Sequence, residues 1–136
     1  MASDRPATKT LNTQAEAIVH FIQQLDIERI DMLLDHRRTY QDLSKRTFVS
    51  RFGAALDKFS RAGDTFLDTH RGHCCSRACG LNRRGYTFIG NKSGHYMDLI
   101  ILAKKGIVHD IYECHYFKTK IEVANRNERI MISDTP

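Results

Sequence analysis

The sequence has no tryptophan, only two prolines and no apolar run long enough to cross a membrane. Its longest apolar runs, such as residues 99–103, fall far short of the about 20 residues that a membrane-spanning helix needs. The first residues, MASDRPATKTLNTQAEA, also lack the apolar centre of a secretion signal. We therefore expect a cytoplasmic protein with no membrane partner.

Cysteine is scarce, with four residues in a chain of 136. This number is too small for the disulfide-dense scaffold of a small secreted protein. A chain of this length is typical of one domain. It can bury about two-thirds of its unfolded surface, so it needs neither a disulfide nor a metal to fold. Any chemistry at the cysteines therefore has to be argued from their positions.

Charge of one sign is not concentrated anywhere, although the net charge is +5 and the pI is near 9.2. Basic residues alternate with acidic ones, and the densest basic groups are pairs: Arg37 with Arg38, Arg83 with Arg84, and Lys104 with Lys105. Domains that bind nucleic acid usually carry a stripe of such residues. We expect an ordinary solvated surface, with a basic nucleic-acid-binding module as an alternative.

The pattern after residue 12 predicts two short helices. Thr13 and Glu16 fit a capping box, and Asp26 can cap a second helix. Apolar residues at helical spacing follow each cap: Ile18, Phe21, Ile22 and Leu25, then Ile27, Ile30, Leu33 and Leu34. Each helix therefore has one apolar face to bury.

A third and stronger helix is predicted after Ser44, which can cap it. The polar residues 36–43 before it fit a loop or a very short edge strand. The apolar stripe of the helix consists of Phe48, Phe52, Ala55, Leu56 and Phe59. Gly63 suits the left-handed position that ends a helix. We expect this helix to form the centre of the core.

The remaining chain has the alternation of strands. We expect strands at residues 64–70, 86–90, 96–103 and 107–118, with an edge strand near 130–132. The last two long strands should form a hairpin closed at residues 104–106. A turn at residues 91–94 is rich in free amides, which fits either a plain hairpin turn or a phosphate site.

Helices followed by an antiparallel sheet predict an α+β fold, with N-terminal helices packed on a curved sheet. Residues 1–12 are expected to be a flexible tail, 13–118 the single domain and 119–136 a C-terminal extension. The element order over 13–118 resembles the cystatin-like cone of the nuclear transport factor 2-like superfamily. The stretches GHCCSRAC, GYTFIGNKSGHYMDLII and DIYECHYFK also resemble short bacterial proteins, a likeness that implies no activity.

The resemblance implies a cone with an internal cavity. Members of the superfamily include enzymes with a pocket in the cone, small-ligand binders and dimeric interaction modules. Enzymes of this shape place an aspartate with a histidine or tyrosine inside the cone. The residues available for such a pocket are Asp98, Asp110, Tyr86 and Tyr112, with His109 nearby. An isomerase or dehydratase using Asp98 or Asp110 is therefore the alternative to a binding protein, and whether the protein is an enzyme stays open.

Three of the four cysteines lie in the segment RGHCCSRACG. Zinc favours four tetrahedral ligands of thiolate and imidazole type, and a loop with two cysteines plus a distant third can supply them. His70 should share a strand face with Cys74. We therefore expect the zinc ligands Cys74, Cys79, Cys114 and His70, with Cys75 and His73 in reserve.

Other interpretations of the thiols remain open. They could be buried as small apolar side chains, or two of them could form a disulfide or redox pair. A catalytic pair of Cys114 and His115 is disfavoured because neighbours on a strand face opposite sides. A homodimer is also expected, because the open sheet face bearing Tyr112 and Tyr116 needs a cover.

Overall fold

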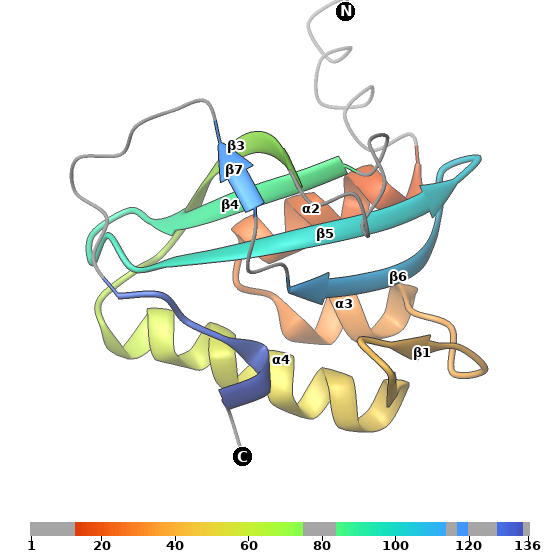
Figure 1. Ribbon diagram of the computed structural model, residues 1–136. Helices are drawn as coiled ribbons and strands as arrows, with labels where there is room; N and C mark the ends of the chain where they lie inside the picture. The colour runs from red at the N-terminus through yellow and green to blue at the C-terminus, as the bar shows by residue number, and fades with distance from the viewer. Residues whose placement is uncertain (1–12, 75–83, 114–116, 120–127, 135–136) are drawn as a thin grey trace, which may run out of the picture.

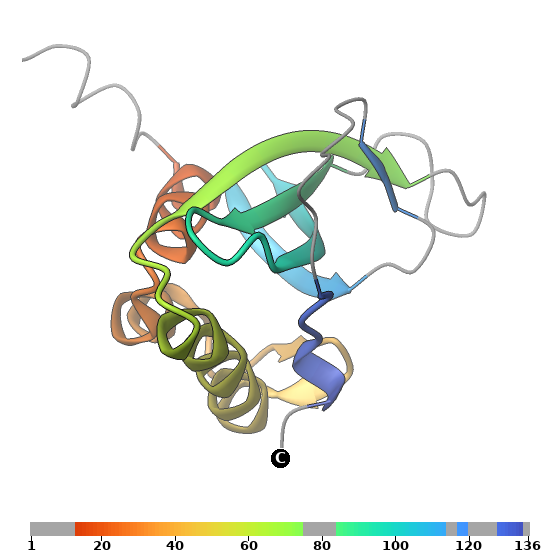
Figure 2. The same cartoon turned by 90° about the vertical axis from the view of Figure 1, so that its left-hand side faces the viewer.

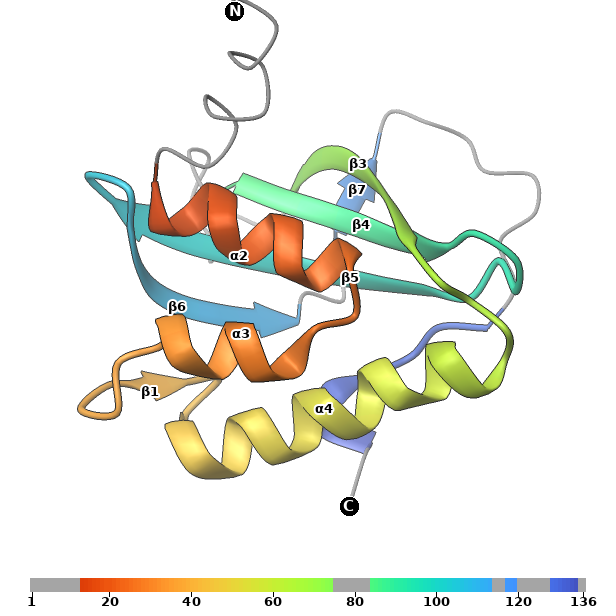
Figure 3. The same cartoon turned by 180° about the vertical axis from the view of Figure 1, so that it is seen from behind.

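The computed structural model describes residues 13–74, 84–113, 117–119 and 128–134 (Figure 1). Within them the chain forms α2 (Gln14–Gln23), α3 (Ile27–Leu33) and α4 (Lys45–Arg61), followed by an antiparallel sheet. The expected α+β class is confirmed. Figure 3 shows the three helices together on one face of the sheet.

The predicted caps are present at all three helices. Oxygens of Thr13, Asp26 and Ser44 each accept a hydrogen bond from the backbone amide three residues later. Each cap satisfies an amide that the helix itself leaves free. The local sequence therefore determines where each helix begins.

The apolar stripe of α4 is buried in full, as predicted. Its members are Phe48, Phe52, Ala55, Leu56 and Phe59. The rings of Phe48 and Phe52 lie 5.4 Å apart, and Tyr40 lies 5.5 Å from Phe48. This aromatic row runs from Tyr40 along α4 within the core.

The main sheet contains five described strands in the order β6-β5-β4-β3-β7. Their bounds are β3 (Leu67–Cys74), β4 (Arg84–Gly90), β5 (Tyr96–Lys104), β6 (Ile107–Glu113) and β7 (Phe117–Thr119). The predicted hairpin between β5 and β6 is confirmed. Its turn holds Lys105 and Gly106 at φ values of 53° and 80°, which glycine adopts readily.

Three predicted strands need correction. The strand expected at 107–118 ends at Glu113, and the separate strand β7 pairs with β3 at the other edge of the sheet. The strand expected at 64–70 begins at Leu67 and runs on to Cys74. The edge strand expected near 130–132 is a single parallel bridge between Tyr96 and Arg129, followed by the short 3-10 helix η3 (Ile132–Asp134).

The segment before α4 forms a small hairpin rather than a loop or a lone edge strand. Its strands are β1 (Thr39–Tyr40) and β2 (Leu43–Ser44), joined by Gln41 and Asp42, both with positive φ. The side-chain oxygen of Gln41 accepts from the backbone amide of Glu113 at 2.8 Å. The hairpin thus covers the end of edge strand β6.

The two faces of the main sheet have different neighbours. Phe88, Met97 and Leu99 belong to the core formed with the helices, on what we call the inner face. Thr87 and Asp98 alternate with them and lie on the outer face, where both are nevertheless buried. Figure 2 shows the curvature of the sheet and the helices beneath its inner face.

Candidate functional site

The proposed zinc ligands lie only partly within the described residues. His70 sits in β3 opposite Thr87, and the strand continues without a register shift to Gly72 and beyond. Cys75, Cys79 and Cys114 lie outside the described residues. Within the residues that are described, no three histidine, cysteine, aspartate or glutamate residues gather as a metal site. The zinc site therefore stays a prediction.

Asp98 is bound on both of its carboxylate oxygens. The hydroxyl of Thr87 donates to Oδ1 at 2.6 Å, and the guanidinium of Arg129 forms an ion pair with Oδ2. The Asp98 side chain is 3% exposed, so the pair is largely shielded from water. An acid or base at Asp98 would first have to release Arg129.

Arg129 is held from a second side, because its guanidinium lies over the ring of Tyr96 at 5.6 Å from the centroid. Burial alone would lower the pKa of Arg129, but the hydrogen bond and charge of Asp98 raise it above the ordinary value. The arginine therefore remains charged. It joins the C-terminal part of the chain to the outer face of the sheet.

The other candidate pocket residues are spread over the sheet. Tyr86 packs against the inner-face core and pairs with Leu99, so it lies on the face opposite to Asp98. Asp110 accepts from the backbone amides of Gln41 and Ile111 at 2.9 and 2.8 Å. Tyr112 is half-buried on β6. The structure does not bring Tyr86 and Asp98 together.

The turn at residues 91–94 is closed by a side chain that the sequence did not point to. The buried carboxylate of Asp64 accepts from the amides of Lys92 and Ser93, both at 2.7 Å, and from the hydroxyl of Ser93 at 2.6 Å. Asp64 thus occupies the place that a phosphate would need. The plain hairpin turn is the interpretation that the geometry supports.

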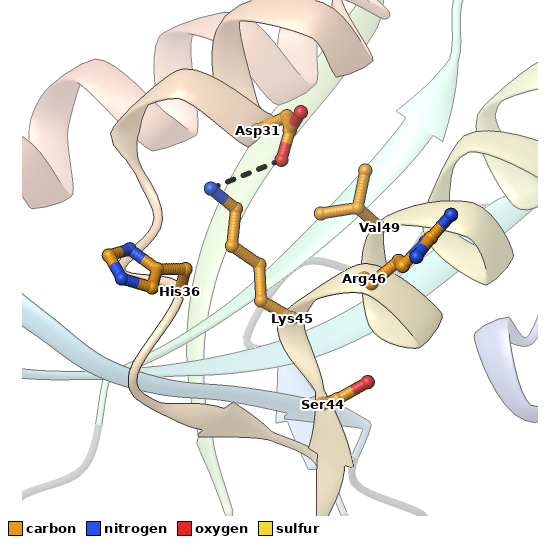
Figure 4. A pocket seen from close by; sticks show the side chains of 6 residues that line it. All are labelled: Asp31, His36, Ser44, Lys45, Arg46 and Val49. Carbon is orange, nitrogen blue, oxygen red and sulfur yellow. Dashed lines mark ion pairs between the residues drawn. The ribbon is translucent and has the colours of Figure 1, made fainter.

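A hollow of about 360 Å³ lies between the end of α3 and the start of α4 (Figure 4). Its lining residues are Asp31, His36, Ser44, Lys45, Arg46 and Val49. The ammonium of Lys45 reaches across to Asp31, with 3.3 Å between Nζ and Oδ1. Lys45, Arg46 and His36 line the hollow together with a single carboxylate, that of Asp31, so a small anion is the kind of ligand that the lining favours.

His109, on edge strand β6, contacts the basic side chain of Arg38. A guanidinium nitrogen of Arg38 lies 3.0 Å from its Nδ1, so that nitrogen accepts the bond and carries no proton. Partial burial, followed by the charges of Arg38 and Lys104, lowers the pKa of His109. The imidazole is therefore kept neutral rather than prepared as an acid.

Comparisons with known proteins give no functional assignment. No protein-family model matches the chain, and neither a curated protein nor a solved structure is significantly similar to it. Among the described helices, none combines the length and apolarity required to span a bilayer. Any functional proposal therefore has to rest on the residues and geometry given above.

Proposed function

We propose that this protein is a binding domain of the cystatin-like cone type, with a structural zinc site at the end of β3. The ligands would be Cys74, Cys79, Cys114 and His70. The proposal is supported most directly by one pairing: Phe117, the first residue of β7, lies opposite Cys74 and comes three residues after Cys114. The end of β3, which carries Cys74, therefore pairs with a strand that begins three residues after Cys114.

Zinc in this position would join the segment after Cys74 to the chain that leads into β7. Thiolate ligation requires deprotonated cysteines, so bound metal also protects the thiols from reagents. The domain should stay folded without the metal, since its helices and sheet form a core of their own. The proposed role of the metal is therefore to link these two segments to each other, while the core keeps the domain folded.

The test is elemental analysis of protein purified under reducing conditions, combined with a count of reactive thiols in the native state. About one zinc per chain and protected thiols are expected. Four freely reactive thiols with no metal would contradict the proposal. Two protected thiols that reductant releases would indicate a disulfide instead.

The hollow between α3 and α4 favours a second activity, binding of a small anionic ligand. Its cationic lining supports this proposal, because Lys45 and Arg46 outnumber Asp31 in charge. Inorganic phosphate is a suitable probe, followed by chemical-shift changes in the full chain. Lys45→Met should weaken the shifts at the hollow, whereas Lys58→Met, at the far end of α4, should leave them unchanged. Equal effects of both substitutions would indicate general charge screening.

The homodimer also stays a proposal. Of the two tyrosines expected at the interface, Tyr116 lies outside the described residues. The burial of Thr87 and Asp98 within one chain leaves less of the outer face to cover than an open sheet would. Among the described residues, the exposed large hydrophobic side chains are Met32 and Ile107. Light scattering decides the point, since a particle mass of 15.7 kDa would mean a monomer.

A further inference from the structure

The ion pair between Lys45 and Asp31 spans the hollow between α3 and α4. Lys45 is the first residue of α4, and Asp31 lies in the last turn of α3. Figure 4 shows the Lys45 side chain extending from the start of α4 toward Asp31. The Lys45 side chain is 20% exposed, whereas that of Asp31 is 49% exposed. Of the two partners, the carboxylate therefore has more room to turn into solvent.

Apolar contacts hold α3 against α4 independently of this ion pair. At the other end of α3, a Cβ atom added at Gly53 of α4 would lie 3.3 Å from Cγ1 of Ile27. Ile30, between Ile27 and Asp31, is fully buried in the core. Because these contacts keep α3 in place, Asp31 can leave Lys45 by rotation about its own side-chain bonds.

The helix ends that border the hollow favour an outside anion over Asp31. The N-terminus of α4 carries partial positive charge. Its first turn contains Lys45 and Arg46 but no acidic residue. The C-terminus of α3 carries partial negative charge, and its last turn contains no basic residue to offset the carboxylate of Asp31. The helix dipoles therefore stabilise an anion at the start of α4 and disfavour a carboxylate at the end of α3.

The hollow also contains charge that Asp31 does not neutralise. Arg46 and His36 are exposed, and in the ranges that the structure describes neither has a hydrogen-bond or ion-pair partner. A free carboxylate carries the same single charge as Asp31 and lacks its attachment to α3, so it competes poorly for Lys45. A phosphate monoester carries a charge of about −1.5 to −2 and three acceptor oxygens, so it can pair with Lys45 and with a second cation. The lining therefore favours a phosphate monoester over a carboxylate.

The size of the hollow allows a ligand larger than inorganic phosphate. Its volume is about 360 Å³. Small-molecule sites usually measure roughly 300–1,000 Å³. At about 30 Å³ for each water molecule, the hollow holds roughly a dozen water-sized groups. Val49 is the apolar member of the lining, so a short organic group attached to the phosphate has a surface to contact.

We propose that the hollow binds a small phosphate monoester, which enters by displacing the carboxylate of Asp31 from Lys45. Asp31 acts as a built-in competitor, because it keeps Lys45 paired while the hollow is empty and disfavours singly charged carboxylates. After displacement Asp31 turns into solvent, and the phosphate takes its place beside the ammonium of Lys45. This inference rests on the anion binding proposed above and is independent of the zinc site.

Titration of the full chain with glycerol 3-phosphate, followed by amide chemical shifts, measures the affinity. Glycerate carries a comparable organic group on a carboxylate, and it should bind at least about tenfold more weakly. Asp31→Asn should raise the affinity for glycerol 3-phosphate by about two- to tenfold, because it removes the competitor and its repulsion of the ligand. Asp57→Asn, which removes an acid of α4 paired with Arg61, is the matched control and should leave the affinity unchanged.

The double variant Asp31→Asn/Lys45→Met distinguishes competition for Lys45 from a general effect of charge. If Asp31 acts through Lys45, the gain from Asp31→Asn should disappear when Lys45 is already replaced. A gain of the same size in both backgrounds, or glycerate binding as tight as that of glycerol 3-phosphate, would overturn the proposal.

The same titrations separate this inference from the anion binding on which it rests. If Lys45→Met weakens binding of glycerol 3-phosphate while Asp31→Asn has no effect, the competition is wrong and anion binding stands. If neither the parent protein nor Asp31→Asn shows shifts at the hollow, the anion binding itself is wrong, and the inference falls with it.

Discussion

Gly90 and Asp64 are in such close contact that no side chain fits between them. A Cβ atom added at Gly90 would overlap Oδ2 of Asp64 and lie 2.7 Å from Oδ1. The carboxylate cannot easily move, because the amides of Lys92 and Ser93 both donate to it. One buried aspartate thus joins the end of α4 to the turn between β4 and β5.

Gly90→Ala should destabilise the protein by about 1–3 kcal/mol, the usual cost of overpacking a tight site. The methyl group would displace the Asp64 carboxylate from its hydrogen bonds. Denaturant melting measures the loss. An unchanged midpoint would show that the turn can shift away from Asp64.

Asp64→Ala should also cost about 1–3 kcal/mol, because amides of the turn lose their acceptor. The substitution at the same time vacates the space that a methyl group at position 90 would need. The double variant with Gly90→Ala should therefore lose less stability than the sum of the two single losses. A strictly additive result would mean that the two residues do not act through the same contact.

Phe52→Ala should cost about 3–5 kcal/mol, as truncation of a core aromatic does. Phe52 has no exposed surface and stacks at an angle against Phe48. Met32→Ala, at a side chain that is 81% exposed, is the control and should change stability by less than about 0.5 kcal/mol. Urea unfolding of both variants provides the comparison, and a similar loss in the two would contradict the assigned core.

The parts of the fold that the sequence predicts well are those set by local contacts. Caps such as Ser44 bond to amides three residues away, and the α4 stripe repeats within one helix. The β5–β6 hairpin is likewise local, since its turn lies between adjoining strands. Spacing alone is sufficient for features of this kind.

The parts of the fold that the sequence does not predict depend on contacts between residues that are distant in sequence. Arg129 pairs with Asp98 across 31 positions, and Asp64 reaches Ser93 across 29. An isolated arginine or aspartate carries no periodic signal of such a partner. The hairpin at Gln41 and Asp42 is also hard to predict, because this pair lacks the Asn-Gly or Asp-Gly signature of tight turns.

The candidate site is predictable only in part for the same reason. The alternation of β3 places His70 correctly within a strand, but the pairing of β7 with β3 rather than with β5 follows from no local pattern. Asp98 is recognisable in the sequence only as an available carboxylate. Its burial with Thr87 and Arg129 needs the sheet register and a segment 31 positions away.

Cys114→Ser tests the proposed metal tie through stability. The substitution should lower the melting temperature of zinc-loaded protein, and chelator should lower that of the parent protein toward the same value. Partial destabilisation is expected, because the core forms independently of the metal. If chelator has no effect on the parent protein while Cys114→Ser still lowers its melting temperature, the cysteine contributes packing and not ligation.

The pKa of His109 should lie below its ordinary value of 6.5, because partial burial and then Arg38 and Lys104 disfavour the imidazolium. Arg38→Gln removes one of these charges, so the pKa should rise partway toward 6.5 in an NMR titration. Arg37→Gln, whose side chain is 80% exposed and pairs with Asp35, should leave the pKa unchanged. An identical pKa in parent and Arg38→Gln protein would exclude the contact.

The same lowered pKa determines the sign of the pH dependence of stability. The unfolded chain binds the His109 proton more tightly than the folded protein does, so protonation favours unfolding. The contribution of neutral His109 to the free energy of unfolding is therefore fully present above about pH 6.5. It is lost as the pH falls through the lower pKa that His109 has in the folded state. Replacing the imidazole in His109→Gln should flatten the stability profile between about pH 5 and 7, measured by urea unfolding at each pH. A profile in which the parent protein gains stability from His109 as the pH falls would reverse the sign and contradict the geometry at Arg38.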